Sequence, residues 1–199
     1  RLLDVLGTDR ATVVGLSIGG MVGLHTALDY PDRMSSLVLI DSSPAFGFDG
    51  STDTDDWVAE RTEPLEAGAT PAEIAPVVLR SVAGPQAPQS VIDEAAAAMS
   101  RIPADGLRAA VRCLTTHDVV DRLDRVAAPT LVAVGDQDTE TPPAYSRYLA
   151  DNIPGARYVE LPNAGHLSNL EAPEELNRLL RGFLLLATVP VNQRGGPER

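Results

Sequence analysis

Hydrophobic residues along the chain follow two patterns, which separate strands from helices. Residues 37–40 and 131–134 are uninterrupted apolar runs, which are typical of parallel strands buried on both faces. Helices are predicted at residues 18–30, which end before Pro31, and from Pro173 onward, where leucines recur with a period of 3.6. Strands are predicted at residues 12–16, 37–40, 131–134 and 157–161. Because these strands alternate with helices, the pattern predicts a parallel α/β sheet of about four strands.

Residues 45–125 interrupt this alternation, because they contain no convincing strand. Helices are predicted there at about 55–67, 71–82, 89–101, 104–115 and 118–123, with prolines between them. An all-helical insert between two strands is expected to cover the carboxyl ends of the strands, where ligand sites of α/β proteins form. The predicted organisation is a core at 1–44 and 126–187, a helical cap at 45–125 and a flexible tail at 188–199.

The first strand passes directly into a helix through the sequence Gly15-Leu16-Ser17-Ile18-Gly19. This pattern is typical of a nucleophile elbow, a tight turn that lifts one serine clear of the sheet. Gly15 and Gly19 have no Cβ, so the strand and the helix can approach closely. Ser17 is then a candidate nucleophile, and the N–H of Ile18 can bind a developing oxyanion. The alternative is a glycine-rich turn with an ordinary serine.

Two later loops supply residues that complete such a site. Asp138 follows the strand at 131–134, and His166 follows the strand at 157–161. The carboxyl ends of parallel strands meet at one edge of a sheet, so both side chains are expected beside Ser17. His166 would accept the proton of Ser17, and Asp138 would orient the imidazole and stabilise its charged form. Asp136 is the alternative for the orienting carboxylate.

Composition narrows the classes of partner. The chain has 199 residues and a formal net charge of −12, and all sixteen of its basic residues are Arg. A net acidic chain without a basic run argues against nucleic acids and anionic membranes as partners. Cys113 is the single cysteine, so no internal disulfide is possible. With no signal peptide or membrane-length apolar run in the sequence, a cytoplasmic location is expected.

With these motifs in place, the chain resembles the α/β-hydrolase superfamily over nearly its whole length, and most of all the 3-oxoadipate enol-lactonases. The segments that carry the resemblance are residues 15–20, 30–33, 141–143, 153–156 and 165–171, with Trp57 and Arg61 in the cap. The resemblance implies Ser17 as nucleophile, Asp138 as acid, His166 as base and the N–H of Ile18 as one oxyanion donor. It implies no metal and no organic cofactor. His25 and His117 are interpreted as structural.

The resemblance also implies a small-molecule substrate. Ser17 would attack the carbonyl of an ester or lactone, with 3-oxoadipate enol-lactone as the implied compound, and water would release the acid. An anionic substrate needs a local cation, so Trp57 and Arg61 are candidate substrate contacts. The alternative is that Trp57 packs the cap on the core and that Arg61 is solvated.

The family places several strands, a helix and a His-Gly loop before the elbow, and that loop supplies a second oxyanion N–H. Only sixteen residues precede Ser17 here, so the sequence resembles the carboxyl-terminal two-thirds of a hydrolase. The predicted activity is therefore that of a longer parent, and the oligomeric state is not predicted. A general carboxylesterase and a cofactor-free haloperoxidase-like hydrolase are alternatives. A non-catalytic binding module is a further alternative, although such modules usually lose a triad residue.

Overall fold

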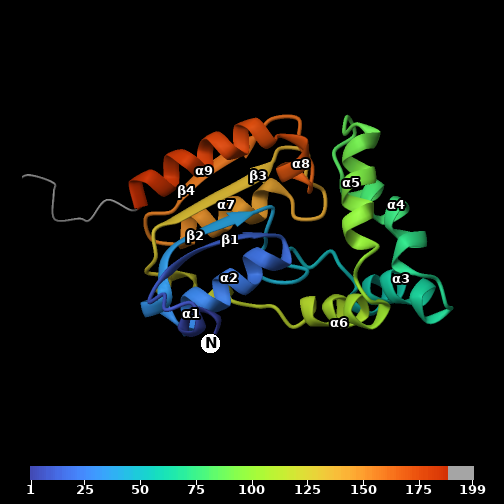
Figure 1. The fold of residues 1–199 in the computed structure, drawn as a ribbon, viewed down its shortest axis with the longest axis horizontal. Coiled ribbons are helices and arrows are strands. Elements are labelled where there is room, and N and C mark those ends of the chain that lie inside the picture. Colours follow the sequence, from blue (N-terminus) through green and yellow to red (C-terminus); the bar gives the residue numbers. More distant parts are fainter. Residues whose placement is uncertain (188–199) are drawn as a thin grey trace, which may run out of the picture.

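The computed structural model describes residues 1–187, so the tail predicted at 188–199 lies outside the described residues. The centre of the molecule is a four-stranded sheet whose strands lie in chain order (Figure 1). Each strand runs parallel to its neighbours. The strands are β1 (Ala11–Leu16), β2 (Met34–Ile40), β3 (Thr130–Gly135) and β4 (Arg157–Leu161). The predicted parallel α/β sheet is therefore confirmed.

Helices cover both faces of this sheet, and Figure 1 shows α2 and α9 on opposite sides of it. Along β2, Leu37 and Leu39 pack in the core beneath α2 and α7, whereas Val38 and Ile40 pack beneath α9. This alternation follows from the two-residue period of a strand, and it explains the uninterrupted apolar run. The flanking helices are α2 (Ile18–Asp29), α7 (Pro143–Asn152) and α9 (Pro173–Ala187).

The segment between β2 and β3 forms a group of helices that lies to one side of the sheet (Figure 1). The side chain of Asp53 caps the first of them, and a capping box between Thr70 and Glu73 begins the second. A bridge between Ala45 and Asp118 joins the two ends of the segment. The helices are α3 (Thr54–Glu66), α4 (Pro71–Val82), α5 (Gln89–Met99) and α6 (Ala104–Leu114).

Five short or unpredicted elements complete the described chain. The helix expected at 118–123 is a 3₁₀ helix, η2 (Val120–Arg125), and α7 was not predicted at all. Pro143 stands at the start of α7, where a proline is tolerated, but polar residues interrupt its apolar face. The remaining elements are α1 (Leu2–Val5), η1 (Pro31–Arg33) and α8 (Ser168–Glu171). Among residues 1–187, no helix combines the length and apolar character needed to cross a bilayer.

The contact between β1 and α2 is the tightest packing around the predicted elbow. A Cβ added to Gly15 would lie 2.2 Å from the carbonyl carbon of Gly19 and 2.4 Å from the nitrogen of Gly20. Backbone atoms cannot move aside as a flexible side chain can, so only glycine fits at position 15. A Cβ on Gly19 would meet no atom within 4 Å beyond its chain neighbours and the adjacent backbone of its own helix. The two glycines of the motif therefore have different roles.

Gly15→Ala is expected to destabilise the protein by at least about 3 kcal/mol, because the added methyl overlaps backbone atoms. Gly19→Ala is the matched control, and it should stabilise α2 by about 0.5–1 kcal/mol because alanine favours the helix. Urea unfolding measures both changes. Equal stability of the two variants would show that the strand-to-helix contact is not as tight as described.

Candidate active site

Ser17 lies at the turn between β1 and α2 in a backbone conformation that L-residues rarely adopt. Its φ is 51° and its ψ is −118°, and a non-glycine residue in this region is strained. Hydrogen bonds hold the strained turn in place: the Ser17 N–H donates to the Ile40 carbonyl at 2.9 Å, and the Ser42 hydroxyl donates to the Ser17 carbonyl at 3.0 Å. The end of β2 therefore supports the turn.

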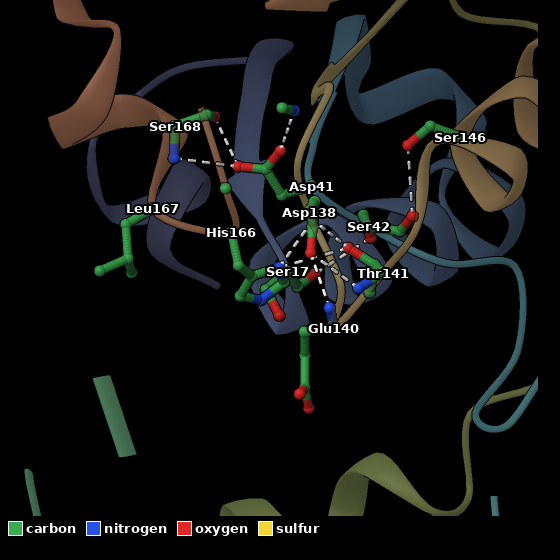
Figure 2. A network of polar contacts seen from close by, with 12 residues as sticks. Ser17, Asp41, Ser42, Asp138, Glu140, Thr141, Ser146, His166, Leu167 and Ser168 are labelled. Carbon is green, nitrogen blue, oxygen red and sulfur yellow. Dashed lines mark hydrogen bonds and ion pairs between the residues drawn. The ribbon is translucent and has the colours of Figure 1, made fainter. Parts of the chain in front are cut away.

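His166 and Asp138 form a buried hydrogen-bonded pair close to Ser17 (Figure 2). The Nδ1 of His166 donates to Oδ2 of Asp138 at 2.9 Å. The other carboxylate oxygen accepts from the backbone N–H groups of Glu140 and Thr141, each at 2.9 Å, and the Thr141 hydroxyl donates to Oδ2 at 2.8 Å. These bonds fix the carboxylate and, through it, the imidazole. Asp136, the sequence alternative, is exposed.

Burial and neighbouring charges shift the pKa of His166 in opposite directions. Burial alone lowers the pKa of the imidazole, but the hydrogen bond and charge of Asp138 outweigh it. The charges of Asp41 and Glu140 add to this effect, so the pKa of His166 is raised above its ordinary value of 6.5. The site is therefore built to stabilise an imidazolium.

Ser17 and His166 line the same cavity, whose volume is about 230 Å³. Among the hydrogen bonds of residues 1–187, none joins the Ser17 hydroxyl to the His166 ring. Such bonds are often loose before a substrate binds. Ile18 is the first residue of α2, so its N–H has no partner within the helix and is available to an oxyanion.

Trp57 and Arg61, the cap residues proposed from the sequence, also line this cavity. The Arg61 guanidinium stacks over the Trp57 ring at 4.1 Å from its centroid. The same guanidinium lies 3.2 Å from each carboxylate oxygen of Glu140. Arg61 is thus neither a solvated side chain nor an unpaired cation, and Glu140 was not anticipated as its partner.

Asp41, at the carboxyl end of β2, ties together the loops that carry Asp138 and His166, and the sequence analysis missed this role. Its carboxylate accepts from the N–H of Gly135 at 2.8 Å and from the N–H and hydroxyl of Ser168 (Figure 2). Gly135 precedes the loop of Asp138, and Ser168 follows His166. Burial raises the pKa of Asp41 to about 7. Its position after a buried strand was the available signal.

Glu171 joins the His166 loop to the cap. Its carboxylate accepts from the N–H groups of Gly165 at 3.0 Å and Leu167 at 3.1 Å, on either side of the histidine. It also accepts from the N–H of Gly84, which follows α4, at 2.9 Å. A Cβ on Gly165 would lie 2.1 Å from the nitrogen of Gly84. The cap and the histidine loop are therefore in direct backbone contact.

The remaining histidines lie apart from Ser17 in a contact of their own. His25 and His117 are 3.2 Å apart between ring nitrogens and pack edge to face, and His117 also contacts the Ser43 carbonyl at 2.9 Å. Burial lowers the pKa of His117. In the described part of the chain, no group of three or more His, Cys, Asp or Glu residues is arranged to hold a metal ion.

A family model described as "alpha/beta hydrolase fold" matches residues 1–173. The chain belongs to the α/β-hydrolase fold family. The resemblance to this family, predicted from the motifs, is therefore confirmed. In α/β-hydrolases the order of catalytic residues along the chain is Ser, acid and His, which is the order of Ser17, Asp138 and His166 here.

Relatives whose names state an activity align with most of this chain. The "Putative carbamate hydrolase RutD" of Variovorax paradoxus is 33% identical over an alignment of 198 residues, which covers 96% of this chain and 71% of that protein. The 3-oxoadipate enol-lactonase 2 of Acinetobacter baylyi is 26% identical over 92% of this chain and 67% of its own length. A thermophilic esterase from Thermogutta terrifontis superposes with a TM-score of 0.82 and 28% identity, covering 94% of this chain and 70% of that one. The chain thus spans about two thirds of these relatives.

The pKa of His166 should fall when its carboxylate partner is removed. In Asp138→Asn the pKa is expected below that of the parent protein, because burial then acts without the compensating charge. Asp136→Asn is the matched control, and it should leave the titration unchanged because Asp136 is exposed. NMR titration of the imidazole, assigned with His166→Gln, measures both. A larger shift in the Asp136 variant would contradict the pairing.

Proposed function

We propose that this α/β-hydrolase is a serine hydrolase that acts on an ester or lactone through an acyl-enzyme. The observation that carries the proposal is the buried Asp138–His166 hydrogen bond beside a strained serine turn. Strain held by surrounding contacts is a mark of functional sites. The completeness of the Ser, Asp and His set also favours an enzyme over a non-catalytic binding module.

In the proposed mechanism, Ser17 Oγ attacks the carbonyl carbon while His166 Nε2 takes its proton. Asp138 holds the imidazolium that forms, in agreement with the raised pKa of His166. The N–H of Ile18 donates to the oxyanion, and a second donor in this fold comes from another loop. His166 then gives its proton to the departing oxygen, which leaves as an alcohol or enol. Water, activated by His166, attacks the acyl-enzyme and releases the acid.

The mechanism draws on side chains and backbone groups, and neither a metal nor an organic cofactor enters any step. The names of the relatives, which include a carbamate hydrolase, an enol-lactonase and an esterase, support hydrolysis at an acyl carbon as the reaction class. A small molecule is the proposed partner, and a cytoplasmic location is proposed from the sequence features given above. The specific substrate expected from the sequence is the enol-lactone of 3-oxoadipate. A haloperoxidase-like activity is the alternative.

Ser17 should react with a fluorophosphonate probe, because a base-activated serine is the group that such probes label. The purified protein is expected to incorporate one probe at Ser17 and to hydrolyse p-nitrophenyl acetate. Ser17→Ala should lose both properties, with turnover reduced by roughly 10⁶-fold. Ser51→Ala, a change at an exposed serine, should retain both. Peptide mass spectrometry measures the labelling. If the protein without substitutions is not labelled at Ser17, the proposal that it is a serine hydrolase is wrong.

A further inference from the structure

The cavity that Ser17 and His166 share is lined mostly by apolar side chains. Ile74 and Val78 of α4 and Leu107 and Val111 of α6 belong to its lining, so these two helices of the cap contribute an apolar surface. Below it stand Ser17 and His166, where the carbonyl of the proposed reaction would lie. A group attached to that carbonyl on the cap side would therefore be buried among aliphatic side chains.

The charged residues that line this cavity are Arg61 and Glu140, apart from the His166 imidazole, and they neutralise each other. Arg61 Nη2 is 3.2 Å from both oxygens of Glu140, and the two side chains are only 25% and 28% exposed. The Glu140 carboxylate points away from the Asp138 network (Figure 2), toward the arginine. Glu60 adds a further carboxylate at 3.7 Å from Arg61 Nη1. The guanidinium thus already has two acidic partners.

We infer that the substrate is an uncharged ester or lactone that carries an apolar group of several carbons on the cap side of its carbonyl. The inference rests on the proposed serine hydrolase function and narrows its substrate class. A carboxylated substrate would need to displace Glu140 from Arg61 or to bury its charge without a partner, and both are costly. The Asp138 carboxylate, hydrogen-bonded to His166, adds negative charge nearby. The carboxylated enol-lactone implied by sequence resemblance therefore fits this cavity less well than a neutral compound.

A series of neutral p-nitrophenyl esters and one carboxylated ester test the inference on the purified protein. From acetate through butyrate to hexanoate, kcat/KM should rise by about fourfold per methylene group, as expected for burial of each methylene. Mono-p-nitrophenyl adipate has the same six-carbon acyl chain as the hexanoate but ends in a carboxylate. Its kcat/KM should be lower by on the order of 100-fold. Equal or faster hydrolysis of the adipate ester would overturn the inference.

Paired variants in α4 locate the effect in the cavity. Val78→Glu places a charge on the apolar wall and should lower kcat/KM for the hexanoate at least tenfold, with a smaller loss for the acetate. Val77→Glu is the matched control, since Val77 is 75% exposed on the same helix, and its kinetics should equal those of the parent. Thermal melting confirms that both variants fold. Equal losses for both esters in Val78→Glu would contradict an apolar acyl site.

Glu140→Gln tests the ion pair directly. The variant leaves Arg61 without its nearer acidic partner, so the ratio of adipate to hexanoate hydrolysis should rise at least tenfold. An unchanged ratio would show that the pairing of Arg61 with Glu140 does not exclude anionic substrates.

Failure of the proposed function can be distinguished from failure of this inference. A protein that hydrolyses none of these esters and is not labelled at Ser17 is not a serine hydrolase. A labelled protein that prefers the adipate ester keeps that function and loses only the inferred substrate class.

Discussion

The backbone of Ser17 is the constraint on which the rest of the site depends. A positive φ at a residue with a side chain is unfavourable, and it persists here because the surrounding chain leaves no alternative. Gly15 lets β1 and α2 approach to backbone contact, and Gly20 leaves room for the Ser42 side chain. The end of β2 holds the turn through hydrogen bonds to the Ser17 backbone. The turn thus requires the parallel pairing of β1 with β2, so the fold and the candidate nucleophile are inseparable.

Three carboxylates hold the loops of the candidate site in place at this edge of the sheet. Asp138 orients His166, Asp41 ties the loops that carry these two residues, and Glu171 links the histidine loop to the cap. Each accepts at least two hydrogen bonds, and most of these come from backbone N–H groups. Carboxylates used in this way fix loops that lack regular structure of their own. Movement of the cap at Gly84 would therefore shift the loop that carries His166.

The sequence predicted the parts of the molecule that depend on local pattern. Buried strands, the glycine-bounded turn at Ser17 and the loops of Asp138 and His166 all follow from short stretches of the chain. Helix α7 was missed because its apolar face is interrupted by polar residues. The partnership of Arg61 with Glu140 joins residues 79 positions apart, and that of Asp41 with Ser168 joins residues 127 apart. Such contacts depend on how the cap and loops pack, which periodicity and motifs do not encode.

Chemical trapping of the acyl-enzyme shows whether Ser17 is the nucleophile. The protein would be quenched in acid during turnover of p-nitrophenyl hexanoate, digested and examined by peptide mass spectrometry. We expect a hexanoyl group on the peptide that contains Ser17, and no turnover or acylation in Ser17→Ala. Acylation of a different residue, or turnover by Ser17→Ala at the parent rate, would contradict this role of Ser17.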